Sequence, residues 1–205
     1  YFLAGRLKTL LPATTRKNLV ALELAPADAK HIGYLTPDKD SGVRLDRYIV
    51  LGEIDKDLTE TFEKQGEVFK TSVEFRGWKA GKNAQGVAKE SIDVALLAPG
   101  TAARLGAGDT CLGLTEVRKA LRYDGRLLII ANGADETSMG GKFEAILEAQ
   151  DLQDLNDLED LVGLDAREAA AGTALRTAGF RLVRVIRDDC DLAIGLCVRR
   201  QEEKV

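Results

Sequence analysis

The residues with the clearest chemical potential follow the first apolar run of the chain. Leu19 to Leu24 has the length of a β-strand, and in the short loop behind it Ala25, Ala27 and Ala29 occupy alternate positions. In nucleotide-binding α/β folds, a glycine-rich turn at this place lets the backbone approach a cofactor. Whether the alanines permit such an approach therefore decides much of what this chain can bind.

Other reactive residue types are sparse. His31 is the only histidine, so no site with several histidine ligands can form, and we predict no metal site. His31 could act as a general base, but it lies among helix-forming residues and a packing role is the simpler interpretation. Cys111, Cys190 and Cys197 are odd in number and form no CxxC pair, which favours reduced cysteines and an intracellular location.

The composition predicts one globular domain. Of the 205 residues, 45% are hydrophobic and 30% are charged. No apolar run approaches the roughly 20 residues that a membrane-spanning helix needs. The 33 acidic residues outnumber the 29 basic ones, so a general nucleic-acid-binding surface is not expected.

The first residues differ from the rest in charge. Tyr1 to Leu22 contains four basic residues and no acid. This pattern resembles the end of an organellar transit peptide, so a mitochondrial location is one expectation and the cytoplasm the other. A basic surface helix from Gly5 to Leu11 is the alternative. We therefore separate a basic extension, residues 1–18, from a domain that comprises residues 19–205.

Apolar runs and turn residues predict strands that alternate with helices. The expected helices are Asp28 to Leu35, Asp55 or Lys56 to Gln65 with Gly66 as its C-cap, one N-capped by Asp109 or Thr110 that extends to about Arg122 and, with breaks, Lys142 to Ala178. The expected strands are Leu19 to Leu24, Leu45 to Glu53, Val68 to Phe75, Ile92 to Ala98, Arg126 to Ala131, Phe180 to Arg187 and Leu192 to Arg199. Such alternation, ending in a hairpin, predicts an α/β fold with a mainly parallel sheet, one antiparallel strand and helices on both faces.

Three segments carry a resemblance to a known family. Ile92 to Leu97, Glu116 to Ile130, and Ala178 to Phe180 with the following hairpin resemble the fourth strand, the fifth-strand region and the C-terminal end of class I S-adenosylmethionine-dependent methyltransferases. The resemblance extends over Leu19 to Arg200. It implies a Rossmann-like, seven-stranded sheet in the order 3-2-1-4-5-7-6, with the cofactor at the C-terminal ends of the first strands.

The resemblance also implies where a cofactor would lie. Glu23 stands at the leading acid of the family's first loop, but Ala25, Ala27 and Ala29 fall on its glycines. An alanine forced into the left-handed conformation costs about 1–2 kcal/mol, and its methyl group occupies ligand space. We therefore predict a degenerate cofactor loop and no bound cofactor, with S-adenosylmethionine as the alternative.

Two further positions belong to this vestigial site. Glu53 matches the acid that hydrogen-bonds both ribose hydroxyls in the family, although an exposed acid at a strand end would look the same. Trp78 lies near the position of an adenine-contacting acid. It could stack on adenine, but a packing role is the simpler expectation.

No catalytic residues are predicted. Ala98-Pro99-Gly100 does not match the motif with which amino-group methyltransferases orient an amine, and Asp93 matches a structural acid of the fold. We therefore predict a methyltransferase-like pseudoenzyme that serves as an accessory or scaffold subunit of a larger assembly. The alternative is an active methyltransferase with an atypical cofactor loop.

The segment 151–164 is rich in both aspartate and leucine. Its acids and leucines each recur every three residues, a spacing that drifts around a helix instead of holding one stripe. A solvated acidic face is one interpretation. The other is that this segment, together with the basic N-terminal extension, contacts other protein subunits.

Overall fold

The computed structural model describes residues 16–79, 86–98, 101, 107–131, 180–187 and 194–200. The N-terminal residues 1–15, the expected helical region from 142 to 178 and the segment 151–164 lie outside the described residues.

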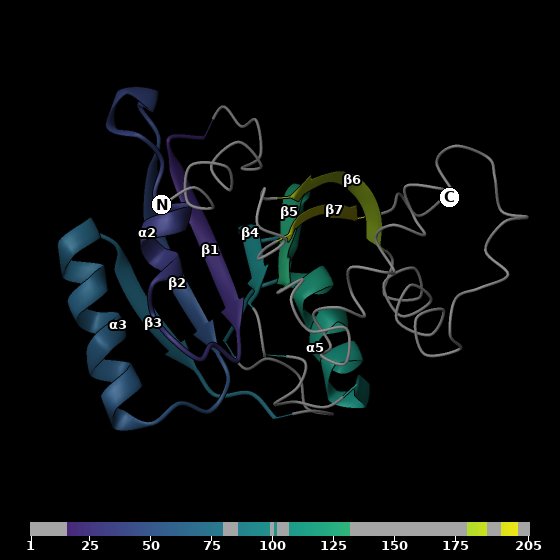
Figure 1. The fold of residues 1–205 in the computed structure, drawn as a ribbon, viewed down its shortest axis with the longest axis horizontal. Helices are drawn as coiled ribbons and strands as arrows, with labels where there is room; N and C mark the ends of the chain where they lie inside the picture. The colour runs from purple at the N-terminus through teal and green to yellow at the C-terminus, as the bar shows by residue number, and fades with distance from the viewer. Residues whose placement is uncertain are drawn as a thin grey trace, which may run out of the picture.

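The described strands form one twisted sheet in the order β3-β2-β1-β4-β5-β7-β6 (Figure 1). Neighbours among the first five are parallel, whereas β7 is antiparallel to both β5 and β6. The predicted order of the parallel strands, 3-2-1-4-5, is confirmed. The strands are β1 (Asn18–Leu24), β2 (Arg44–Leu51), β3 (Ser72–Arg76), β4 (Ile92–Leu97), β5 (Leu121–Ala131), β6 (Phe180–Arg187) and β7 (Ile194–Arg200).

Helices cover both faces of the sheet. The described helices are α2 (His31–Leu35), the 3-10 helix η1 (Lys39–Ser41), α3 (Lys56–Phe69) and α5 (Ala107–Ala120). Ala21 of β1 belongs to the buried cluster that includes Ile32 of α2 and Phe62 of α3. Leu24 lies against Gly113 of α5. Since side chains alternate between the faces of a strand, α2 and α3 cover one face and α5 the other.

Aromatic side chains fill the space beneath α3. Tyr48 and Phe62 are fully buried, with ring centroids 5.9 Å apart, and Phe75 makes an edge-to-face contact with Phe62 at 6.3 Å. Each such pair adds about 0.5–1.5 kcal/mol to the free energy gained by burying the rings. These contacts hold α3 on β2 and β3, next to the C-terminal edge of the sheet.

Several predicted boundaries were wrong. Gly66 is not a C-cap, because α3 continues to Phe69 and Lys70 takes the left-handed cap conformation with φ 55°. A β-carbon on Gly66 would lie 2.8 Å from the Thr71 carbonyl oxygen, so this glycine permits the chain after the helix to pack closely against it. The next strand consequently starts at Ser72, later than expected.

The fifth strand also differs from its prediction. It begins at Leu121, directly after α5, and not at Arg126. Within α5, Leu114, Val117 and Ala120 are buried, whereas Leu112 is 46% exposed. Glycine at 113 lets the backbone of this helix lie close to Leu24.

We predict that Gly66→Ala destabilises the fold despite the better helix propensity of alanine. Alanine favours a helix over glycine by about 1 kcal/mol. Its methyl group, however, would lie 2.7 Å from Val73 and 2.8 Å from the Thr71 carbonyl oxygen. Moving backbone costs more than that gain, so we expect a net loss of about 1–2 kcal/mol. Urea unfolding measures it. Gly77→Ala is the control, because nothing lies within 4 Å of its added β-carbon, and an equal loss in both variants would contradict the packing explanation.

Candidate functional site

The loop after β1 begins with a strained alanine. Ala25 has φ 42°, in the left-handed region that favours glycine, and its N–H donates to the Leu51 carbonyl at the end of β2 over 2.8 Å. At the first of the three family glycine positions, the chain therefore keeps the conformation of a glycine. The cost is about 1–2 kcal/mol.

The other two alanines behave differently from each other. Neither has a positive φ. Ala27 is exposed, whereas Ala29 is 2% exposed and belongs to the hydrophobic core beneath α2. The methyl group of Ala29 thus packs with the core. The three alanines thus differ: Ala25 is strained, Ala27 is exposed and Ala29 packs into the core.

Two residues that sequence reasoning missed hold this loop. Gly52 has φ 151°, and a β-carbon on it would lie 3.2 Å from the α-carbon of Ala25, so a glycine lets the ends of β1 and β2 approach. Thr101, fully buried after β4, places its hydroxyl 3.4 Å from the Leu24 carbonyl and 3.3 Å from that of Ala25. The Gly52-Glu53 pair was a usable signal in the sequence; Thr101 carried none.

Glu23, the leading acid of the loop, is fully buried. Its Oε2 accepts a hydrogen bond from the Tyr48 hydroxyl over 2.5 Å, and its Oε1 lies 2.8 Å from Nδ1 of His31. His31 is also buried, so it is a packed histidine and not a surface one. Both carboxylate oxygens are thus used by side chains on β2 and α2.

The surroundings of Tyr48 keep it protonated. Burial raises the pKa of its phenol well above 10.0, and the neighbouring Glu23 carboxylate raises it further. A phenol that keeps its proton remains a hydrogen-bond donor to Glu23. This direction agrees with the short contact between the two groups.

Glu53 and Lys79 form an exposed ion pair at the end of β2. The Lys79 Nζ lies 2.9 Å from the Glu53 carboxylate, and both side chains are about two-thirds exposed, 66% and 69%. The carboxylate raises the pKa of Lys79. An exposed pair of this kind contributes little to stability, so Glu53 can exchange its partner for another hydrogen-bond donor.

Trp78 is buried to 5% exposure. Its ring lies close to Gly113 of α5, beside Leu24, in a packing position. Its indole Nε1 is buried and has no hydrogen-bond partner within the part of the chain that the structure describes. Trp78 is thus a packed side chain, and the residue that follows it, Lys79, pairs with the exposed Glu53.

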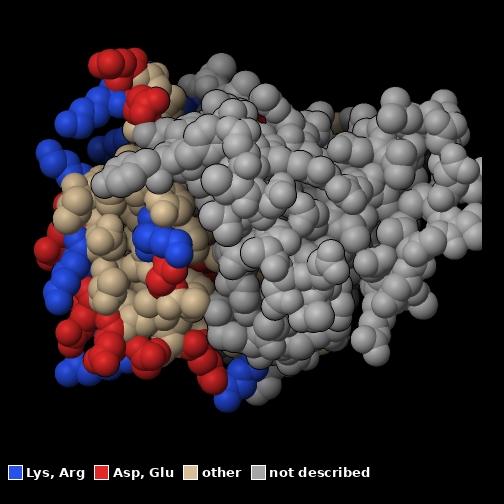
Figure 2. Space-filling model, in the orientation of Figure 1, with Lys and Arg blue, Asp and Glu red and all other residues tan. Residues whose placement is uncertain are grey.

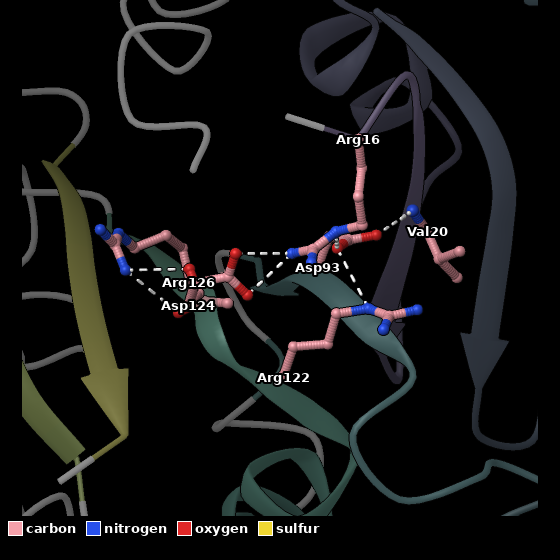
Figure 3. A network of polar contacts seen from close by, with 7 residues as sticks. Arg16, Val20, Asp93, Arg122, Asp124 and Arg126 are labelled. Atoms are coloured by element: carbon pink, nitrogen blue, oxygen red, sulfur yellow. Dashed lines mark hydrogen bonds and ion pairs between the residues drawn. The ribbon is translucent and has the colours of Figure 1, made fainter. Parts of the chain in front are cut away.

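A second polar cluster lies at the opposite, N-terminal edge of the sheet (Figure 3). Asp93 is buried in β4, where Oδ2 accepts from the Val20 N–H over 2.9 Å and Oδ1 lies 2.8 Å from Arg16 and 3.2 Å from Arg122. Arg16 also donates to Asp124 over 2.7 Å and lowers the pKa of that carboxyl. Asp93 therefore joins the strands β1, β4 and β5 and lies far along them from the loop.

The described surface mixes both signs of charge (Figure 2). Figure 2 shows basic and acidic side chains interspersed over the described part of that face. Among the described residues, no group of three or more histidine, cysteine, aspartate or glutamate side chains could hold a metal ion. No helix in the described ranges is long and apolar enough to span a membrane.

The fold is similar to those of solved methyltransferases. An S-adenosylmethionine-dependent methyltransferase from Aquifex aeolicus matches with TM-score 0.53 and 14% identity over 95% of this chain and 87% of that chain. One from Methanosarcina mazei matches with TM-score 0.53 and 12% identity over 92% and 95%. The Burkholderia thailandensis 1,6-didemethyltoxoflavin-N1-methyltransferase, solved with bound 1,6-didemethyltoxoflavin and S-adenosylhomocysteine, matches with TM-score 0.55 and 14% identity over 98% of this chain and 78% of that chain.

In sequence, no family model and no curated protein matches the chain. The structural similarity shows that the chain has a methyltransferase-like, Rossmann-like fold, as predicted from the resemblance.

The prediction of no cofactor is contradicted by these neighbours. They include S-adenosylmethionine-dependent enzymes and one solved with S-adenosylhomocysteine. The physical reason for the error lies in the loop. The prediction relied on a cost of strain and of lost ligand space at all three alanines, but Ala25 adopts the glycine conformation and the methyl group of Ala29 packs into the core.

We predict that Asp93→Asn lowers the free energy of unfolding by about 3 kcal/mol, at the lower end for a broken buried ion pair. The reason is that two arginines lose a buried carboxylate, although they remain 34% and 35% exposed and keep part of their hydration. Denaturant unfolding at neutral pH gives the value. Asp46→Asn is the matched control: its partner Arg44 is 68% exposed, so that loss stays below about 1 kcal/mol. Similar losses in both variants would show that Asp93 is not the main tie between these strands.

A second expectation concerns alkaline pH. Because the pKa of Tyr48 is raised in the folded state, its contribution to stability is present below the unfolded value near 10 and is lost as the pH rises above it. Tyr48 should therefore ionise only when the chain unfolds. Tyrosinate absorbance against pH tests this: Tyr48→Phe should leave the native titration unchanged and reduce only the absorbance step at unfolding. A reduced native titration would mean that Tyr48 ionises within the folded protein.

Proposed function

We propose that this chain binds S-adenosylmethionine at the C-terminal edge of the sheet and acts as a methyltransferase with an atypical cofactor loop. The supporting observation is the conformation of Ala25, whose φ of 42° reproduces the turn that a glycine makes at the first loop position. The bound sulfonium cofactor would supply an activated methyl group. The similarity to S-adenosylmethionine-dependent enzymes supports the same assignment.

Glu53 is the residue of this chain best placed to hold the ribose. It follows β2, its side chain is 69% exposed, and among the described residues it pairs with the exposed Lys79. Two hydroxyl groups can donate to its carboxylate at little cost, because an exposed ion pair contributes little to stability. Trp78 would support the site from below by packing beneath α5.

A second function is favoured by one residue. Ala98, buried to 4% exposure, follows β4 where amino-group methyltransferases carry a residue that orients the amine. An alanine side chain can neither accept nor donate a hydrogen bond. An accessory subunit that binds S-adenosylmethionine without transferring its methyl group would need no amine-orienting residue at position 98. Incubation with methyl-labelled cofactor and candidate acceptors separates the two functions, since only the first releases S-adenosylhomocysteine.

We predict measurable binding of S-adenosylhomocysteine to the wild-type protein and binding about tenfold weaker or worse in Glu53→Ala. The loss follows from removing hydrogen bonds to a charged group, which are worth about 1.5–3 kcal/mol. Titration calorimetry gives both dissociation constants. Glu60→Ala is the control, since Glu60 is also exposed and paired with a lysine, but lies on α3.

Two outcomes of this titration contradict separate statements. No heat of binding at millimolar ligand would overturn the proposed function itself. Equal affinity in Glu53→Ala and the wild type would exclude Glu53 as the ribose partner while leaving cofactor binding intact.

In either function, we propose that residues 151–164 contact partner subunits together with the N-terminal extension. The leucines and aspartates, which each recur every three residues, support this, because leucine burial would give affinity and the acids would orient a basic partner. We expect amide exchange in this segment to be slower in the native assembly than in the isolated protein. Equal exchange in both states would exclude the contact.

A further inference from the structure

We propose that His31 is a positioning residue that fixes the loop after β1 through its hydrogen bond to Glu23. The inference rests on the proposed function, since its consequence is stronger binding of a cofactor at this loop. Glu23 thereby serves as an internal anchor of the loop and not as a group that contacts the ligand.

The contact between Glu23 and His31 joins the two ends of the loop after β1 and so closes the loop. Glu23 is the next-to-last residue of β1 and His31 is the first residue of α2. The 2.8 Å contact between Oε1 and Nδ1 therefore joins the two ends of the segment Leu24 to Lys30. A segment tied at both ends has fewer conformations to lose when a ligand binds, so its affinity rises.

Burial makes the contact specific. Glu23 and Tyr48 are 0% exposed and His31 is 3% exposed, so none of these polar groups can exchange its partner for bulk water. The Tyr48 hydroxyl donates to Oε2, which leaves Oε1 for His31. Since a carboxylate only accepts, the imidazole must carry its proton on Nδ1.

The groups around His31 are consistent with a donor at Nδ1. The Asp28 carboxylate lies 3.9 Å from that nitrogen and is itself paired with Lys30 over 2.8 Å. Tyr34 presents its ring edge-to-face at 5.7 Å. The charge nearest to the imidazole is thus negative on two sides, from Glu23 in β1 and from Asp28 in the loop.

The contact between Glu23 and His31 helps to hold the strained backbone of Ala25. Ala25 lies inside the closed segment and holds a left-handed conformation that an unconstrained alanine would leave. The hydrogen bond of its N–H to Leu51 fixes one side of the residue, and the Glu23–His31 contact fixes the far end of the loop. A glycine would need no such restraint.

The test compares two substitutions of the same histidine. His31→Asn keeps a donor at the position of Nδ1, whereas His31→Leu removes it and retains an apolar side chain. We expect S-adenosylhomocysteine to bind about tenfold more weakly to His31→Leu, the equivalent of one hydrogen bond to a charged group, and within about threefold of wild type to His31→Asn. Amide exchange of residues 25–30 should accelerate in the leucine variant alone.

Tyr48→Phe is the matched control. It removes the other donor to Glu23 without opening the loop, so it should lower stability while its loop exchange stays close to that of wild type. Equal affinity and equal loop exchange in His31→Leu and the wild type would overturn the inference. If the asparagine variant loses as much affinity as the leucine variant, the role is packing and the positioning role is also overturned.

A measurement on the unmodified protein completes the test. His31 is the only histidine, so nitrogen-15 spectra of its ring report one imidazole. A proton on Nδ1 that exchanges slowly supports the closure, whereas a neutral ring protonated on Nε2 alone overturns it, even if the variants do not fold. Absence of ligand binding by the wild type would overturn the proposed function, while the ring spectrum and loop exchange would still decide whether His31 closes the loop.

Discussion

The buried carboxylate of Glu23 is the interaction on which the rest of the site depends. It lies with no exposure between β1, β2 and α2, and its two oxygens are held by Tyr48 and His31. A buried carboxylate without partners is expensive, so these two donors are a condition for folding this edge of the sheet. The same contacts set where α2 starts and hence the path of the loop. A change to these contacts would therefore alter both the position of the loop and the stability of the core.

The N-terminal edge of the sheet also contains a buried carboxylate, but its partners are of a different kind. Asp93 is buried like Glu23, but its partners are arginines that remain about one-third exposed, 34% and 35%. At the N-terminal edge, charged arginine side chains reach Asp93 from solvent. At the other edge, the Tyr48 phenol and the His31 imidazole contact Glu23 inside the core. Arginine keeps its charge at any pH at which proteins fold. Burial beside Glu23 raises the pKa of the Tyr48 phenol, so this phenol remains an uncharged donor to the Glu23 carboxylate.

The apolar pattern of the sequence predicted the central strands because helices cover both faces of the sheet there and bury the side chains of β1 and β4. Ile92–Leu97, buried at every position, is the clearest case. Contacts between elements were not predictable in the same way. Gly66 looked like a helix end, yet its role is set by Thr71 and Val73 across a turn. The different environments of Ala27 and Ala29 also depend on the core beneath α2, which no local pattern describes.

The alanine loop can be judged by comparing magnitudes. Holding Ala25 left-handed costs about 1–2 kcal/mol. An alanine also loses less backbone freedom on folding than a glycine, which returns about 0.5–1 kcal/mol. The remaining difference is about 1 kcal/mol, less than a tenfold change in a binding constant. One hydrogen bond to a buried charged group exceeds that difference. The side chains that fix the loop therefore weigh more in ligand binding than the change from glycine to alanine at Ala25.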